Sequence, residues 1–130
     1  MNKNIFKAYD IRGRYPQEIN EKTMAEIAPL LAKIFKNKKI IIGHDARLSS
    51  PLLYQAIIKE LKKYKIKKII SIGLATTPMI YFLVNNLKTD GGIIITASHN
   101  PKEYNGLKVV GKKAKMISGY EISKLIRKFS

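Results

Sequence analysis

Residues 92–101, Gly92-Ile93-Ile94-Ile95-Thr96-Ala97-Ser98-His99-Asn100-Pro101, join a wholly apolar run to a dense group of polar side chains. The apolar part, residues 92–96, predicts a β-strand because it is short and rich in β-branched residues. Two similar runs occur earlier in the chain, at residues 39–43 and 68–73. Strands without an alternating polar face are typical of a largely parallel sheet that is buried on both sides.

Amphipathic segments between these runs predict helices. We expect a kink or a locally lost hydrogen bond at Pro29, because it lies inside the apolar pattern of the first helix. Two further strands are expected at residues 5–9 and 107–110. Signals for helix starts, in the form of cap residues, cap-plus-proline pairs or a capping box, occur at Asn20, Ser50-Pro51, Thr77-Pro78 and Ser118 to Glu121.

The alternation of strands and helices predicts an α/β protein with a mixed, mostly parallel sheet covered by helices on both faces. The 130 residues fit a single domain, 1–130, and the 45% hydrophobic content supplies a core and argues against disorder. The apolar runs are too short to cross a membrane, and the absence of cysteine excludes disulfides. The first ten residues lack the apolar stretch of a signal peptide, so we expect a cytoplasmic location.

The chain is strongly basic, with 25 Lys and Arg against 9 Asp and Glu and a formal net charge of +16. Such a charge suits a polyanion, but arginine, which reads base edges best, occurs only at positions 12, 14, 47 and 127. Most lysines fall on expected helix flanks and turns, as in a solvated surface. A nucleic-acid partner is therefore not expected, whereas an acidic small molecule would be attracted.

Ligands of α/β proteins bind beyond the carboxyl ends of strands, which directs attention to residues 44–50, 74–77 and 97–106. In the third loop we expect the end of the strand to expose the Ser98 hydroxyl, with His99, Asn100 and Lys108 as nearby hydrogen-bond donors. A serine among donors suits a hydroxyl that carries phosphate, because phosphate oxygens accept hydrogen bonds and need charge compensation.

Other chemistries fit these residues less well. A serine hydrolase is disfavoured, because successive side chains such as those of Ser98 and His99 point apart and no Gly-x-Ser-x-Gly elbow is present. Two histidines without cysteine make a poor zinc site. On the residues alone, a simple polar turn built on Asn100-Pro101 and Asn105-Gly106 remains an alternative.

Four segments, taken in order, resemble the α-D-phosphohexomutases, the superfamily of phosphomannomutase, phosphoglucomutase and their amino-sugar relatives. They are residues 6–13, 43–50, 73–78 and 96–108. The resemblance implies that Ser98 carries a phosphoryl group, passes it to a hexose monophosphate to form a bisphosphate, and receives the other phosphate back. It implies catalytic roles for Ser98, His99, Lys108 and Arg12, and substrate contacts from Tyr9, Arg12, Asn100 and Lys108. We interpret His44 and the Asp45–Arg47 pair as structural residues that hold a loop.

Members of this superfamily usually have four domains, and the resemblance covers the first. The second domain supplies an Asp-Gly-Asp-x-Asp loop that holds Mg²⁺ together with the phosphoserine, so Ser98 would reach the metal only through its phosphate. The loops that recognise the sugar and its phosphate belong to domains III and IV, and no such motif occurs here. We expect partners in the remaining domains and a phosphorylated hexose, a hexose bisphosphate as activator, and little turnover from this chain alone.

Two other functions stay open at this stage, namely a basic module that binds polyanions or nucleic acid, and an inert folding or interaction domain. Faces that other domains normally cover would favour a homo-oligomer. Because the sugar-recognition loop is absent, the residues do not indicate whether the hexose is mannose, glucose or an amino sugar.

Overall fold

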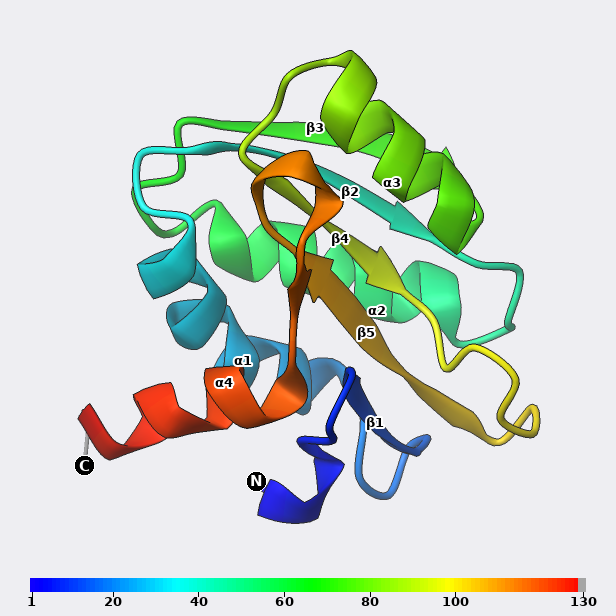
Figure 1. Ribbon diagram of the computed structural model, residues 1–130. Helices are drawn as coiled ribbons and strands as arrows, with labels where there is room; N and C mark the ends of the chain where they lie inside the picture. Colours follow the sequence, from blue (N-terminus) through cyan, green and yellow to red (C-terminus); the bar gives the residue numbers. More distant parts are fainter. Residues whose placement is uncertain (129–130) are drawn as a thin grey trace.

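The computed structural model describes residues 1–128 (Figure 1). The strands are β1 (Ile11–Arg14), β2 (Lys39–His44), β3 (Lys68–Leu74), β4 (Gly91–Ile95), β5 (Tyr104–Val110) and β6 (Met116–Ile117). The α-helices are α1 (Glu21–Ile34), α2 (Ser50–Leu61), α3 (Thr77–Asn86) and α4 (Gly119–Ser123), and 3₁₀ turns cover Lys3–Ile5, Lys112–Ala114 and Lys124–Lys128.

The six strands form one sheet in the order β1-β5-β4-β2-β3, with β6 paired to β5. Strand β2 is parallel to both β3 and β4. Strand β5 is antiparallel to β1, β4 and β6, so among the described strands β5 alone runs against the common direction. The expected mixed, mostly parallel sheet is therefore confirmed, and a single reversed strand makes it mixed.

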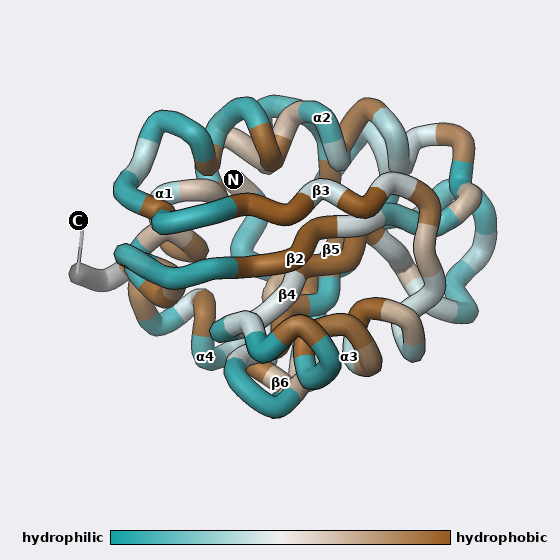
Figure 2. Tube along the Cα trace, turned by 90° about the horizontal axis from the view of Figure 1, so that it is seen from above, coloured by the Kyte–Doolittle hydropathy of each residue, from teal (hydrophilic) through white to brown (hydrophobic). Residues whose placement is uncertain are grey.

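Each isoleucine run is apolar throughout because both faces of the sheet are covered. Helices α1 and α2 lie on one side of the strands and α3 lies on the other (Figure 2). Side chains alternate between these faces along a strand. Ile40 and Ile42 join the larger core beneath α1 and α2, whereas Ile41 joins a smaller cluster with Ile80 and Val84 of α3.

The strand expected at residues 5–9 is wrong. The chain makes a 3₁₀ turn at Lys3–Ile5 and then reverses, with the Lys7 amide donating to the Asp10 carbonyl at 2.8 Å. The strand is instead β1, which begins directly after this turn. The apolar residues Ile5 and Phe6 suggested a strand here because both are buried, but Phe6 forms only an isolated antiparallel bridge with Ile11 and no continuous strand.

The helix starts are largely as expected. Asn20 and Ser118 both cap their helices through complete capping boxes. At α2 and α3 the N-cap lies one residue earlier than expected, at Ser49 and Thr76, so each proline is the second helical residue. Helix α1 continues through Pro29 without interruption.

Two lysine-rich segments lie at the starts of β2 and β3, where Figure 2 shows the trace as hydrophilic, and a third surrounds the 3₁₀ turn at Lys112–Ala114. Lys39 is paired in register with Lys68, and the lysines around them are exposed, as expected of a solvated surface. Within residues 1–128, no helix has the length and apolar character needed to cross a membrane.

Candidate functional site

The three loops singled out from the sequence meet in one pocket of about 780 Å³ at the carboxyl ends of β2, β3 and β4. The sheet brings them together because these neighbouring strands are parallel and end at the same edge. The lining combines a carboxylate, hydroxyls, an ammonium and an imidazole with apolar side chains. Its residues are Asp45, Ala46, Leu74, Ala75, Thr76, Thr77, Pro78, Met79, Thr96, Ser98, His99 and Lys108.

Ser98 lies three residues beyond the end of β4 in a left-handed backbone conformation, with φ +56°. A non-glycine residue in such a conformation typically costs about 1–3 kcal/mol, so neighbouring contacts must hold it. Its amide donates to Thr96 Oγ1 at 3.0 Å, and its carbonyl accepts from Arg47 at 2.8 Å. The backbone of Ser98 is thus held on both sides.

The Ser98 hydroxyl is not exposed, contrary to the expectation from its position after a strand. Its Oγ is buried and has no hydrogen-bond partner within residues 1–128. The Ser98 amide bonds back to Thr96 Oγ1, so the chain turns at this residue instead of continuing outward from the strand. A buried polar atom without a partner is uncommon and marks a place where a further polar group would be favoured.

Lys108 and His99 share the pocket with Ser98. Lys108 lies opposite Ile94 in the antiparallel pairing of β4 and β5. Because Leu107 and Val109 belong to the larger core, alternation turns Lys108 to the α3 side of the sheet, where the pocket opens. His99 is exposed. These three predicted residues are therefore brought together, and the cavity receives a hydroxyl, an ammonium and an imidazole from them.

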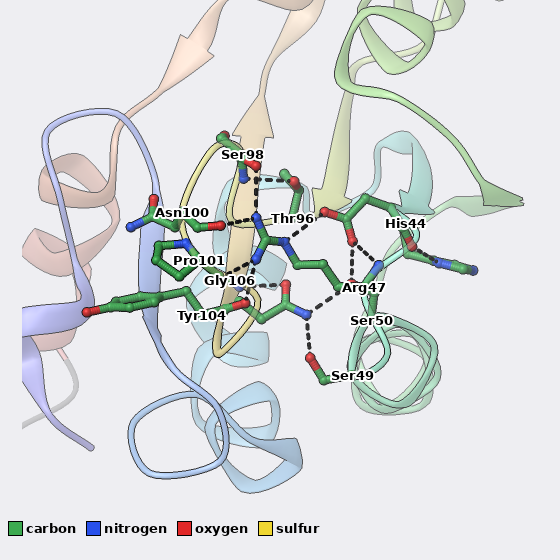
Figure 3. Close-up of polar contacts among 12 residues, drawn as sticks. His44, Arg47, Ser49, Ser50, Thr96, Ser98, Asn100, Pro101, Tyr104 and Gly106 are labelled. Carbon is green, nitrogen blue, oxygen red and sulfur yellow. Dashed lines mark hydrogen bonds and ion pairs between the residues drawn. The ribbon is translucent and has the colours of Figure 1, made fainter.

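Arg47 reaches the whole Ser98 loop from the segment after β2 (Figure 3). Its Nη1 donates to the carbonyls of Pro101 at 2.7 Å and Tyr104 at 3.2 Å, and its Nη2 donates to those of Ser98 at 2.8 Å and Asn100 at 2.7 Å. Its Nε pairs with the Asp45 carboxylate at 3.3 Å. The interpretation of Asp45 and Arg47 as residues that hold a loop is confirmed.

A second group of hydrogen bonds, centred on Asn105, supports this loop, and the sequence did not predict it. Asn105 is fully buried, and its Nδ2 donates to Ser49 Oγ at 2.7 Å and Ser50 Oγ at 3.0 Å. Ser50 Oγ in turn donates to Asp45. The sequence indicates only turn chemistry at Asn105, because no local pattern distinguishes a turn asparagine from one whose amide links two loops.

Arg12 and Asn100 contact each other beside the pocket rather than lining it. Arg12 Nη1 donates to Asn100 Oδ1 at 2.6 Å, and Arg12 Nε pairs with Asp10 Oδ1 at 2.8 Å. Asp10 is only 4% exposed and was not singled out from the sequence. Burial raises the pKa of Asp10 above its ordinary value of 3.8, against the opposing effect of Arg12, Lys108 and Lys7. Tyr9 is 67% exposed and does not line the pocket.

The raised pKa of Asp10 predicts a pH-dependent stability. Between the ordinary and the raised value, the folded chain binds more protons at Asp10 than the unfolded chain, so the free energy of unfolding falls as pH rises. Asp10→Asn removes this proton uptake. We therefore expect the stability of Asp10→Asn relative to the wild type to rise with pH through that interval and then level off. Urea unfolding of both proteins over a pH series measures it, and a relative stability that stays constant or falls would contradict it.

Comparison with known proteins identifies the family. The domain description "Phosphoglucomutase/phosphomannomutase, alpha/beta/alpha domain I" matches residues 3–130. The chain belongs to the phosphoglucomutase/phosphomannomutase family. A Klebsiella pneumoniae phosphomannomutase is 45% identical over 114 residues, which are 88% of this chain and 72% of that protein. The phosphomannomutase of Escherichia coli K12 is 44% identical over 114 residues, 88% of this chain and 25% of that enzyme.

Solved structures of the same family share the fold. A phosphoglucomutase/phosphomannomutase family protein of Burkholderia thailandensis has a TM-score of 0.81 and 28% identity, over 98% of this chain and 30% of that one. A protein described as a phosphomannomutase of Thermus thermophilus has a TM-score of 0.82 and 27% identity, over 91% of this chain and 28% of that one. The chain spans about a quarter of the length of the first curated relatives it matches, which are phosphohexose mutases of Xanthomonas campestris.

The phosphoglucomutase/phosphomannomutase domain present here does not by itself fit a Mg²⁺ site. Within residues 1–128, no three His, Asp or Glu side chains are grouped so as to hold a metal ion. Among the described residues, Asp45 supplies the one carboxylate that lines the pocket, and this carboxylate already accepts from Ser50 and pairs with Arg47. Octahedral coordination of Mg²⁺ requires oxygens that this pocket does not supply.

Proposed function

We propose that this chain is the phosphoserine-bearing first domain of a phosphohexomutase and that Ser98 is the phosphoryl carrier. The observation that carries the proposal is the state of Ser98: a buried hydroxyl without a partner among residues 1–128, in a strained loop held from both sides, at a pocket that also holds Lys108 and His99. A phosphoryl group on Ser98 Oγ would bring three acceptor oxygens to these donors.

The transfer can be written for the residues of this chain. A hydroxyl of a hexose monophosphate attacks phosphorus, an oxygen–phosphorus bond forms to the sugar, and the bond from phosphorus to Ser98 Oγ breaks. Lys108 accepts the proton of the attacking hydroxyl, and the same proton is then returned to the departing serine oxygen, so no net proton is gained or lost. His99 assists at the same oxygen. In the second half the other phosphate of the bisphosphate returns to Ser98 by the reverse steps.

Arg12, Asn100 and Tyr9 serve binding in this proposal. Arg12 contacts the loop through Asn100, and it provides charge for a substrate phosphate. Asn100 keeps its amide oxygen on Arg12 and thereby orients the loop against β1. Tyr9 is exposed and therefore free to contact a sugar or a neighbouring domain. Mg²⁺ and a hexose bisphosphate belong to the complete enzyme, with the metal held by groups outside this chain and by the phosphate on Ser98.

Several apolar side chains beside the pocket are exposed, namely Leu74, Met79 and Phe82. Exposed apolar groups next to a binding pocket indicate a covered surface in the working protein. We assign this face to the remaining domains of the parent enzyme, or to a second copy of the chain when they are missing. The chain alone is expected to show no mutase turnover, because phosphoryl transfer depends on positioning and charge neutralisation that further domains supply.

A chimera tests the proposed function. The matching segment of Escherichia coli phosphomannomutase is replaced by this chain, and interconversion of mannose 1-phosphate and mannose 6-phosphate is measured. We expect turnover from the chimera and none above background from the isolated chain. The unmodified Escherichia coli enzyme is the reference. A chimera that folds like this reference but shows no turnover would contradict the proposal.

A further inference from the structure

All the N–H donors of Arg47 are occupied, by the Ser98 loop and by Asp45. A guanidinium has five N–H donors. Four of them meet the backbone carbonyls of Ser98, Asn100, Pro101 and Tyr104, and the fifth, on Nε, faces the Asp45 carboxylate. The side chain is only 14% exposed. Arg47 therefore has no free donor for a phosphate, although it lies next to Ser98.

All four Nη donors of Arg47 bond to backbone carbonyl oxygens. Carbonyl oxygens carry partial negative charge and would repel a phosphoryl dianion. In Figure 3 the Ser98 carbonyl points toward the guanidinium of Arg47, as do the carbonyls of Asn100 and Tyr104. The carbonyl oxygens of the loop therefore point toward Arg47, whereas Ser98 Oγ makes no hydrogen bond to Arg47.

We propose that Arg47 is a positioning residue for phosphoryl transfer at Ser98. Its guanidinium holds the loop carbonyls away from the phosphoryl group and fixes the left-handed conformation of Ser98. This inference rests on the proposed function, because it assigns Arg47 to the same transfer. Lysine cannot replace arginine here, since an ammonium has three donors in a tetrahedral arrangement and no planar fork.

Hydrogen exchange on the isolated chain tests the loop independently of activity. The amides of Ser98, Asn100 and Tyr104 donate to Thr96, Ala97 and Pro101, so they report whether the loop is closed. We expect Arg47→Lys to accelerate their exchange by about tenfold or more and to leave the amides of α1 unchanged. Arg14→Lys is the matched control, because Arg14 stacks over the Tyr104 ring at 5.4 Å without holding the loop carbonyls. Unchanged exchange of the loop in a folded Arg47→Lys protein would overturn the inference.

Kinetics of the chimera test the consequence for transfer. A positioning role predicts that Arg47→Lys lowers kcat by about 10- to 100-fold with little change in KM. A phosphate-binding role would instead raise KM. We also expect guanidinium ion to restore part of the activity of Arg47→Ala. If Arg47→Lys does not fold, Asp45→Asn takes its place in the exchange experiment, because it removes the carboxylate that pairs with Arg47 Nε.

The two proposals fail in different ways. A wild-type chimera without turnover would count against the proposed function, while the exchange experiment would still decide whether Arg47 closes the loop. An active chimera in which Arg47→Lys has normal kcat, or raises KM alone, would overturn the positioning role only.

Discussion

Alanine at Ser98 is expected to reduce the mutase activity of the chimera by about 10⁴-fold or more, because in the proposed mechanism Ser98 forms the covalent bond and its loss removes the reaction path itself. The same change is expected to leave stability nearly unaltered. Ser98 Oγ has no hydrogen-bond partner within residues 1–128, so alanine leaves no donor or acceptor unsatisfied. Coupled assays and thermal unfolding measure the two effects.

The control for this prediction is Ser71→Ala, a serine exposed on β3. Incubation with a hexose bisphosphate and Mg²⁺, followed by intact-mass measurement, shows whether each chimera accepts a phosphoryl group. We expect one added phosphate in the wild type and in Ser71→Ala, and none in Ser98→Ala. Retention of more than about a tenth of the activity by Ser98→Ala would remove Ser98 from the mechanism.

Alanine at Gly106 is expected to have the largest effect on folding. A Cβ at Gly106 would lie 1.9 Å from the carbonyl oxygen of Ile11 and 2.9 Å from the Cα of Arg12. Both atoms belong to the backbone of β1, so relief requires β1 to separate from β5, to which it is paired at this residue. We expect a loss of more than about 3 kcal/mol in the free energy of unfolding, at or beyond the upper end of ordinary overpacking.

Gly73→Ala is the matched control for backbone crowding. Gly73 has φ +72°, but apart from its two chain neighbours no atom of residues 1–128 lies within 4 Å of the position that a Cβ would take there, so alanine meets backbone strain without a collision. A loss of about 1 kcal/mol is expected at this position. Urea unfolding compares the two variants, and equal losses would show that the approach of β1 to β5 is looser than the structure indicates.

The sequence alone was sufficient for most of the regular elements of this fold, although it misplaced the first strand and did not predict β6. The isoleucine runs of β2 and β4 are local in sequence, and their apolar character at every position already indicates a sheet covered on both faces. The sequence indicates the helix starts at Asn20 and Ser118, because a capping box spans only four residues and can be recognised locally. The resemblance of residues 96–108 and three earlier segments predicted the family correctly, and the ends of the expected strands directed attention to the loops that line the pocket.

The tertiary structure alone decided how the site is held. Arg47 bonds to carbonyls 51 to 57 residues away, and Asn105 bonds to serines 55 and 56 residues away. The burial of Asp10 and of the Ser98 hydroxyl also arises only in the tertiary structure. Side-chain periodicity reports which face of an element is buried, because that pattern repeats within a few residues. The partner of a polar group is chosen only when the sheet brings distant loops together, so no local pattern contains it.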